Sequence, residues 1–201
     1  DDIMLSLDGD TTLDQGYLSS VMDAFEHQPW MTALAIPYYH KLTGREPEDR
    51  AILRYEIYMR CYLLNMMRIK NPYAFTAIGS AMALPVRSYK RVGGITPFKS
   101  GEDFYFMQKL AKNGKLGVWS ELPVYPAARF SDRVFFGTGP AMIKGNRGDW
   151  SSYPIYHPND FDLVEETYHS FTQLFEQNVS TPMDSFLVDK YPVWDSFILP
   201  S

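Results

Sequence analysis

Apolar residues near the start of the chain change their spacing from one segment to the next. Residues 3–7 form a short apolar run, which predicts a strand, and the next apolar residues fall at helical spacing over residues 18–25. Residues 31–36 form a second apolar run, closed by Pro37, which predicts a buried strand. The start of the chain therefore predicts a strand, a helix and a second strand.

The longest amphipathic segment predicts a helix from Pro47, which suits a first helical turn, to about Ile69. Asn71-Pro72 follows, and proline ends the helix because it cannot continue the hydrogen-bond ladder. One face of this helix is traced by four large side chains at helical spacing: Tyr55, Met59, Tyr62 and Met66.

The second half of the chain mixes clear elements with an irregular stretch. A β-leaning stretch, a short helix, a longer helix and a short strand are predicted, in this order, at residues 74–84, 87–92, 100–113 and 116–119. Gly114 suits a left-handed cap after the longer helix. Residues 123–158, rich in glycine, proline and aromatic residues, predict loops, and residues 160–176 predict a last helix. Strands that alternate with helices favour an α/β sandwich.

Composition excludes several classes of protein. The chain has 201 residues, 45% of them hydrophobic and 15% aromatic, which suits one domain with a sizeable core. No apolar run reaches the roughly 18 residues of a membrane span, so we expect no span in this segment. A net charge of -5 gives no broad basic field for nucleic acid, which favours small-molecule or carbohydrate partners. The single cysteine, Cys61, excludes an internal disulfide framework.

Two carboxylates follow the first predicted strand. Asp8 and Asp10 lie two residues apart, so both side chains can lean to one side at the edge where open α/β sheets bind ligands. Two hard oxygen donors there suit Mg²⁺ or Mn²⁺ bridging a diphosphate. An Asx-type turn that caps the following helix is the structural alternative for the same residues.

A second acidic pair, Glu102-Asp103, follows Ser100. The spacing of Ser100 and Asp103 fits a capping box, in which the serine caps the helix and the aspartate reaches back to it. The functional interpretation makes Asp103 a general base that takes a proton from an acceptor hydroxyl, with Glu102 supporting the site. Asp103 cannot serve both roles fully at once.

Four motifs together resemble family 2 glycosyltransferases of the GT-A fold. In order, they are Leu7-Asp8-Gly9-Asp10-Thr11, Ala77-Ile78-Gly79-Ser80-Ala81, Arg91-Val92-Gly93-Gly94-Ile95 and Gly101-Glu102-Asp103. The similarity runs from about Ile3 to Phe136, and the stretches 129–133 and 136–139 look like the region of the family that closes over substrate. Beyond Asn146 no further motif matches.

The resemblance implies roles for individual residues. Asp8 and Asp10 would form the D-x-D motif that binds the metal and the donor diphosphate, and Asp103 would match the base of the E-D motif. Gly93 and Gly94 would admit the acceptor or sugar. Two arginines are candidates for binding the diphosphate, because a guanidinium fork matches phosphate oxygens, with an ordinary surface role as the alternative: Arg129 and Arg133.

The implied reaction is a metal-dependent, inverting transfer from a nucleotide-sugar, for which UDP-sugar is the prior expectation. The acceptor would be a glycan or a lipid-linked sugar in polysaccharide synthesis, on the cytoplasmic side and at the inner face of a membrane. Residues 1–146 would form the catalytic-domain portion with both acidic motifs, and residues 147–201 a helical or irregular extension of the same domain.

The position of the D-x-D motif departs from the family pattern. In this fold the motif closes the nucleotide-binding half, whereas here it lies at the very start of the chain, which has no initiator Met. We therefore expect an excised fragment that lacks the N-terminal nucleotide-binding strands and that binds donor poorly by itself.

Two other interpretations remain open at the level of sequence. Residues 8–12 also satisfy the D-x-D-x-T pattern of haloacid-dehalogenase-like phosphatases, for which Lys90 or Lys99 would supply the lysine. Alternatively, the chain is a non-catalytic carbohydrate-binding fragment that stacks aromatic rings on sugars. Its candidate tryptophans are Trp30, Trp119, Trp150 and Trp194.

Overall fold

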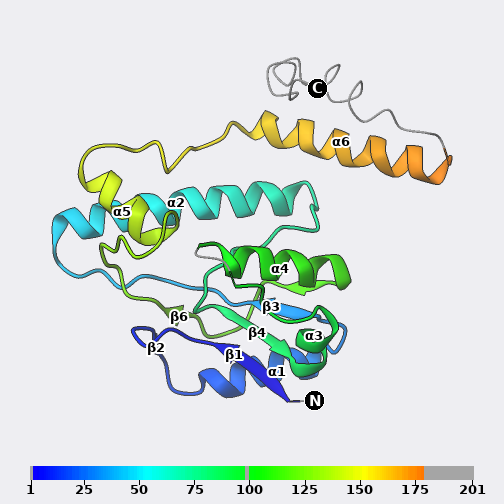
Figure 1. Cartoon of the computed structure of the whole chain (residues 1–201), viewed down its shortest axis with the longest axis horizontal. Coiled ribbons are helices and arrows are strands. Elements are labelled where there is room, and N and C mark those ends of the chain that lie inside the picture. Colours follow the sequence, from blue (N-terminus) through cyan, green and yellow to red (C-terminus); the bar gives the residue numbers. More distant parts are fainter. Residues whose placement is uncertain (1, 98–99, 179–201) are drawn as a thin grey trace. The chain divides into compact units, whose positions relative to one another are not determined.

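The computed structural model describes residues 2–97 and 100–178, which divide into two compact units after Tyr156 (Figure 1). Lys99 and Trp194, two of the candidates named above, lie outside the described residues. Within the described ranges, no helix is both long and apolar enough to cross a membrane.

The main sheet of the first unit has four strands. Their order is β1-β4-β3-β5, with the bounds Ile3–Ser6, Met82–Pro85, Ala33–Ala35 and Leu116–Gly117. β4 runs antiparallel to both β1 and β3, so β1 and β3 point the same way, and β5 is parallel to β3. The carboxyl ends of β1 and β3 therefore lie at the same edge as the start of β4. A separate antiparallel pair joins β2 (Thr12–Leu13) to β6 (Val124–Tyr125).

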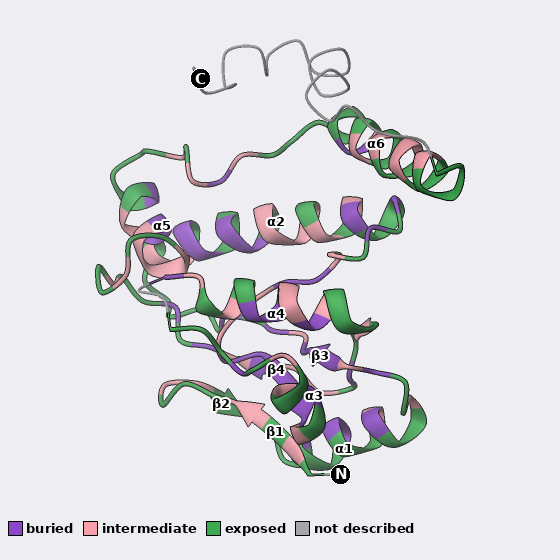
Figure 2. Ribbon diagram, turned by 45° about the vertical axis from the view of Figure 1, so that its right-hand side comes forward, coloured by how far each residue is buried: buried purple, intermediate pink, exposed green. Residues whose placement is uncertain are grey.

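β3 and β4 are buried along their whole length, because helices cover both faces of the sheet (Figures 1 and 2). Leu34 and Ala83 lie in a core with helix α1 (Tyr17–His27) on one face. On the other face, a second core holds side chains of helix α4 (Glu102–Asn113), together with strand residues of the opposite parity: Ala33, Ala35, Met82 and Leu84.

A third core joins helix α2 (Glu46–Arg68) to helix α5 (Thr138–Asn146). Ile52 of α2 packs in it with Met142 of α5, and Tyr153 also belongs to this core, so residues 147–156 pack with the first unit. Helix α3 (Val86–Arg91) follows β4 directly. The second unit contains helix α6 (Pro158–Glu176), whose first turn is capped by the His157 side chain.

Most of the predicted elements are confirmed, but two details are wrong. Of residues 74–84, only the last three are in strand β4, and the preceding residues form a loop. The stretch predicted as loops, residues 123–158, contains α5 as well as β6.

Both predicted caps of α4 are also wrong. The residue before the helix is Gly101, in a left-handed conformation (φ 75°) and without a side-chain cap, so the capping box is absent. The Ser100 hydroxyl instead accepts a hydrogen bond from the Phe135 amide at 2.9 Å. Gly114 after the helix has an extended backbone rather than a left-handed one. Glycine is needed there because a Cβ would collide with Thr32.

Candidate active site

A cavity of about 600 Å³ lies at the edge of the main sheet where β1 and β3 end and β4 begins. This is the edge at which open α/β sheets bind their ligands. Residues of α2, the first turn of α4 and the segment 126–139 complete its walls. The six charged residues that the sequence placed in the site all line this cavity: Asp8, Asp10, Glu102, Asp103, Arg129 and Arg133.

Asp8 follows β1 and is held by the loop that leads into β4. The Ser80 hydroxyl donates to Asp8 Oδ2 at 2.8 Å, across 72 positions of sequence. The Asp8 carbonyl accepts from the Thr11 amide at 3.1 Å, which turns the chain directly after the strand. The D-x-D turn is thus formed locally, and its first carboxylate is oriented by Ser80, in the loop that leads into β4.

Asp10 forms an ion pair with Arg129, another residue of the cavity wall. Its Oδ2 lies 2.9 Å from Arg129 Nη2, with both side chains partly exposed. The pair therefore links the start of the chain to the segment 126–139. Because water reaches both partners, we attribute little stability to it. It matters instead because it places a guanidinium next to an acidic pair inside one cavity.

Asp103 lies in the first turn of α4 and is partly buried. Burial raises the pKa of its carboxyl, and the neighbouring charges of Glu102 and Asp8 raise it further, against a 2.7 Å hydrogen bond from the Phe104 amide. The effect of Asp8 on this pKa shows that the two acidic motifs are close enough to interact electrostatically. A carboxyl with a raised pKa holds a proton more readily than an ordinary aspartate, as a general base must.

The Gly93-Gly94 pair is not among the residues that line the cavity. Both glycines follow α3 with positive φ (73° and 71°), and a Cβ on Gly94 would lie 2.8 Å from the Tyr89 ring. The Lys109 ammonium of α4 donates to the Gly94 carbonyl at 3.3 Å. In this structure the pair therefore shapes the turn between α3 and α4.

The segment 126–139 closes one side of the cavity through two close approaches. A Cβ on Gly101 would lie 2.7 Å from the Phe136 ring, and a Cβ on Gly139 would lie 2.5 Å from the Ser131 carbonyl oxygen. Glycine at position 101 lets the segment pack against the start of α4, and glycine at position 139 lets the segment fold closely against its own residue Ser131. Arg133 and Phe136 in this segment both line the cavity.

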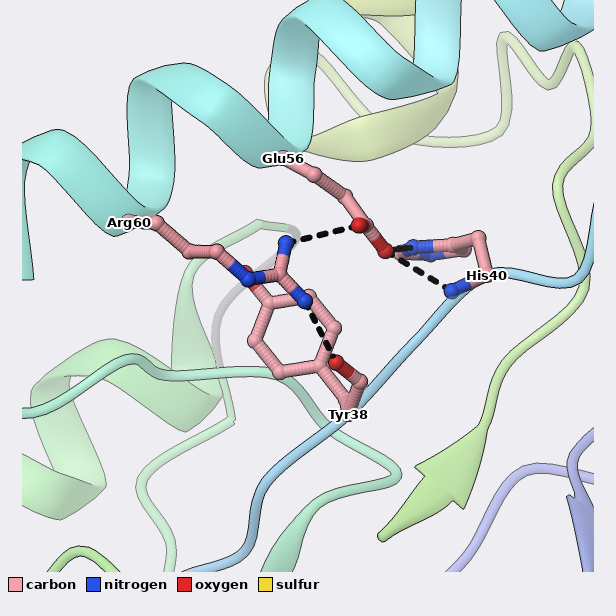
Figure 3. Close-up of polar contacts among 4 residues, drawn as sticks. All are labelled: Tyr38, His40, Glu56 and Arg60. Carbon is pink, nitrogen blue, oxygen red and sulfur yellow. Dashed lines mark hydrogen bonds and ion pairs between the residues drawn. The ribbon is translucent and has the colours of Figure 1, made fainter.

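Two features of the cavity were missed by the sequence interpretation. Tyr55, Tyr58 and Tyr62 of α2 line one wall, and Tyr156 meets the Tyr62 ring edge-on at 6.3 Å between centroids. His40, which follows β3, also lines the cavity and is hydrogen-bonded to Glu56 of α2 (Figure 3). The helical spacing of the tyrosines had indicated only a helix face, and no motif marks His40.

The carboxylates of this cavity can hold a divalent cation only if phosphate oxygens of the substrate and water supply its other ligands. Within residues 2–97 and 100–178, no group of three or more histidine, cysteine, aspartate or glutamate side chains could hold a metal ion. Asp8 and Asp10 offer two carboxylates in one cavity. Mg²⁺ and similar hard cations are commonly held by one or two carboxylates, with phosphate oxygens and water completing the shell.

Apart from the D-x-D residues, which the phosphatase interpretation shares, the described residues named for the two rival interpretations do not line the cavity. Lys90 on α3, which the phosphatase interpretation needs, is not among its lining residues. Trp30 and Trp119 are exposed and are not part of the cavity wall either. Trp150 instead packs against the third core, with the Arg54 guanidinium over its ring.

Comparison with known families identifies the family of the chain. The model of the family described as glycosyl transferase family group 2 matches residues 3–177. The match corrects the expectation that the similarity fades after Phe136, because it continues through α6. A search of curated proteins and a search of solved structures each returned no significant match. The chain therefore belongs to the glycosyl transferase family group 2, and it is a glycosyltransferase.

Proposed function

We propose that this protein transfers a sugar from a nucleotide-sugar to an acceptor hydroxyl with inversion at the anomeric carbon, using a divalent cation. The observation that carries the proposal is that one cavity contains Asp8, Asp10, Asp103 and Arg129, the residues that supply both acidic motifs and a phosphate partner. UDP-sugar is the first donor to test, and glycan or polysaccharide synthesis is the proposed setting.

Asp8 and Asp10 would hold Mg²⁺ or Mn²⁺ together with the donor diphosphate. When bound, such an ion stabilises the negative charge on the departing nucleoside diphosphate. Arg129 now pairs with Asp10 at 2.9 Å, and a diphosphate entering the cavity would compete for its guanidinium. Arg133, which lines the same cavity, is the second proposed phosphate partner.

Asp103 is the proposed general base. It would take the proton of the acceptor hydroxyl while the acceptor oxygen bonds to the anomeric carbon and the bond from that carbon to the diphosphate oxygen breaks. The nucleoside diphosphate leaves with the electrons of the broken bond. Glu102, next to Asp103, contributes negative charge that keeps the Asp103 pKa raised. The rest of the rate enhancement comes from holding the reactants together in a fixed orientation.

The test is a thermal-shift titration of the full-length protein with Mn²⁺ and a panel of nucleoside diphosphates. We expect one nucleotide to raise the melting temperature only when Mn²⁺ is present, and Asp10→Asn to remove the shift. Asp23→Asn is the matched control, because Asp23 is exposed on α1 and does not line the cavity. A nucleotide shift that survives Asp10→Asn would contradict the proposed metal and donor site.

A further inference from the structure

His40 occupies an unusual position for a histidine. It follows β3 at the edge of the sheet that forms the cavity, and its side chain is only 2% exposed although it lines that cavity. Histidine is costly to bury without partners, because both ring nitrogens need hydrogen bonds. One of the two has a clear partner in the protein.

That partner is Glu56 on α2 (Figure 3). Its Oε1 lies 2.9 Å from His40 Nδ1 and accepts a second hydrogen bond, at 2.7 Å, from the His40 amide. The other oxygen, Oε2, accepts from Arg60 Nη1 at 2.6 Å, and Arg60 Nη2 donates to the Tyr38 carbonyl at 2.8 Å. Both oxygens of the Glu56 carboxylate therefore accept hydrogen bonds, one from His40 and one from Arg60, and these bonds fix its orientation.

The charge state of Glu56 decides which nitrogen of His40 carries a proton. Burial by itself would raise the pKa of Glu56, but the hydrogen bonds from His40 and the charge of Arg60 outweigh it and hold the pKa below its usual value. Glu56 is therefore ionised at neutral pH and can only accept hydrogen bonds. His40 Nδ1 must then be the donor, which leaves Nε2 as the ring nitrogen available to a ligand.

Glu56 and Arg60 do not line the cavity, whereas His40 does. The pair therefore reaches the cavity through the imidazole, which it fixes in one orientation and one tautomer. Tyr55, Tyr58 and Tyr62 line the same cavity from α2. A rigid polar group beside aromatic rings suits a sugar ring, whose hydroxyls form hydrogen bonds and whose C–H face packs against aromatic carbon.

We propose that His40 is a substrate-binding residue whose Nε2 hydrogen-bonds a hydroxyl of the sugar in the cavity, and that Glu56 is the positioning residue behind it. A hydroxyl both donates and accepts, so it can bond Nε2 in either protonation state of the imidazole. The hydroxyl belongs either to the donor sugar or to the acceptor sugar. This inference rests on the proposed function, because it needs a sugar in this cavity.

Two substitutions test the roles of the two ring nitrogens of His40 one at a time. In His40→Asn the amide nitrogen takes the place of Nδ1 and can still donate to Glu56, but nothing replaces Nε2. In His40→Gln the longer side chain carries its amide to the place of Nε2, but it loses the bond to Glu56. A ligand-binding role and a purely structural role therefore predict opposite outcomes for the two variants.

The donor arm compares the binding of UDP with that of UDP-glucose and UDP-N-acetylglucosamine by the full-length protein in Mn²⁺. The acceptor arm measures saturation-transfer NMR signals of glucose and N-acetylglucosamine with UDP and Mn²⁺ present. In one of the arms, we expect His40→Asn to weaken sugar binding by about tenfold at an unchanged melting temperature, since one hydrogen bond is lost. We expect His40→Gln to keep most of the binding, and the affinity for UDP to stay the same in both variants.

The arm that responds identifies the sugar that His40 contacts. If wild-type protein binds sugars and His40→Asn matches it in both arms, the inference about His40 is overturned and the proposed function stands. If His40→Gln loses sugar binding while His40→Asn keeps it, the Glu56 contact is structural, and the inference is again overturned. If wild-type protein binds no nucleotide and no sugar, the proposed function fails and this inference fails with it.

Discussion

Asp103 combines two properties that oppose each other in an ordinary aspartate. It lies at the start of a helix, where the helix dipole favours negative charge, yet burial and the charges of Glu102 and Asp8 raise its pKa. The hydrogen bond from the Phe104 amide keeps its Oδ1 in place. The residue is thus oriented by its backbone neighbour while its affinity for a proton is increased by its surroundings.

The raised pKa of Asp103 predicts the pH dependence of transfer. A general base works only when deprotonated, so activity should fall as the pH drops through the Asp103 pKa. That fall should occur at a higher pH than for an aspartate with the usual value of 3.8. The measurement is kcat/KM for transfer from a UDP-sugar as a function of pH.

Asp103→Asn is the companion variant in this experiment. It should lower kcat by about 10²- to 10⁴-fold across the whole pH range, the usual contribution of a general base. Asp23→Asn, in an exposed residue of α1 that does not line the cavity, should leave the profile unchanged. An Asp103→Asn variant that keeps the wild-type rate and acid limb would exclude Asp103 as the base.

At the scale of elements, the contact between α2 and α5 supports the wall of the cavity. α2 carries the three tyrosines of that wall, and α5 begins at Thr138, at the end of the segment 126–139. Ile52 of α2 is 1% exposed and packs in the third core with Met142 of α5. The packing of these two helices therefore holds two parts of the cavity lining in place.

Ile52→Ala should lower the free energy of unfolding by about 2–5 kcal/mol, because it removes buried methyl groups and leaves a cavity in the core. Leu53→Ala, in the next residue of the same helix, is the control: Leu53 is 45% exposed, and its loss should change stability by less than about 0.5 kcal/mol. Urea denaturation measures both values. Equal effects of the two substitutions would show that the third core contributes little.

The helices that sequence periodicity predicted well are those whose local signals agree with their packing. Pro47 and Asn71-Pro72 bound α2 in the sequence almost where it begins and ends in the structure. α5 was missed because its nine residues include two glycines and a proline, so its propensity is poor, and it is stabilised by burial of Ala141 and Met142. Tertiary contacts of this kind leave no periodic signal.

The residues of the candidate site also differ in whether local sequence signals could predict them. Asp8, Asp10 and Asp103 were predicted because each lies in a short motif at the end of an element, and the structure brings all three to one cavity. The His40–Glu56 pair was missed because its members are 16 residues apart and meet only when α2 packs against the segment that follows β3. The Gly93-Gly94 motif was visible in the sequence, but these glycines do not line the cavity. Their positive φ angles explain why glycine is present at both positions.

At the scale of the whole molecule, the three hydrophobic cores found among residues 2–97 and 100–178 lie in the first unit. Every residue assigned to them falls between Ile3 and Tyr153. The second unit begins at His157, whose side chain caps its own helix. The first unit therefore contains the buried apolar surface that a domain of its size needs to fold.

A chain that ends at Tyr156 should consequently fold by itself. We expect a single cooperative thermal transition by circular dichroism and dispersed amide signals in a ¹H–¹⁵N NMR spectrum. A chain that ends at Asn146 serves as the comparison, because it lacks Trp150 and Tyr153 of the third core and should melt at a lower temperature. A non-cooperative transition for the chain ending at Tyr156 would show that α6 is required for folding.

The cavity also has a consequence for how the protein is made. Its walls come from segments as far apart as Asp8 and Tyr156, and the partner of Asp10 is Arg129. Ribosomes add about 5–20 residues per second, so the acidic turn waits on the order of ten seconds for that arginine. Throughout this interval the nascent chain lacks a closed pocket. If a sugar nucleotide binds in this cavity as proposed, it can assist folding only after the segment 126–139 has left the ribosome.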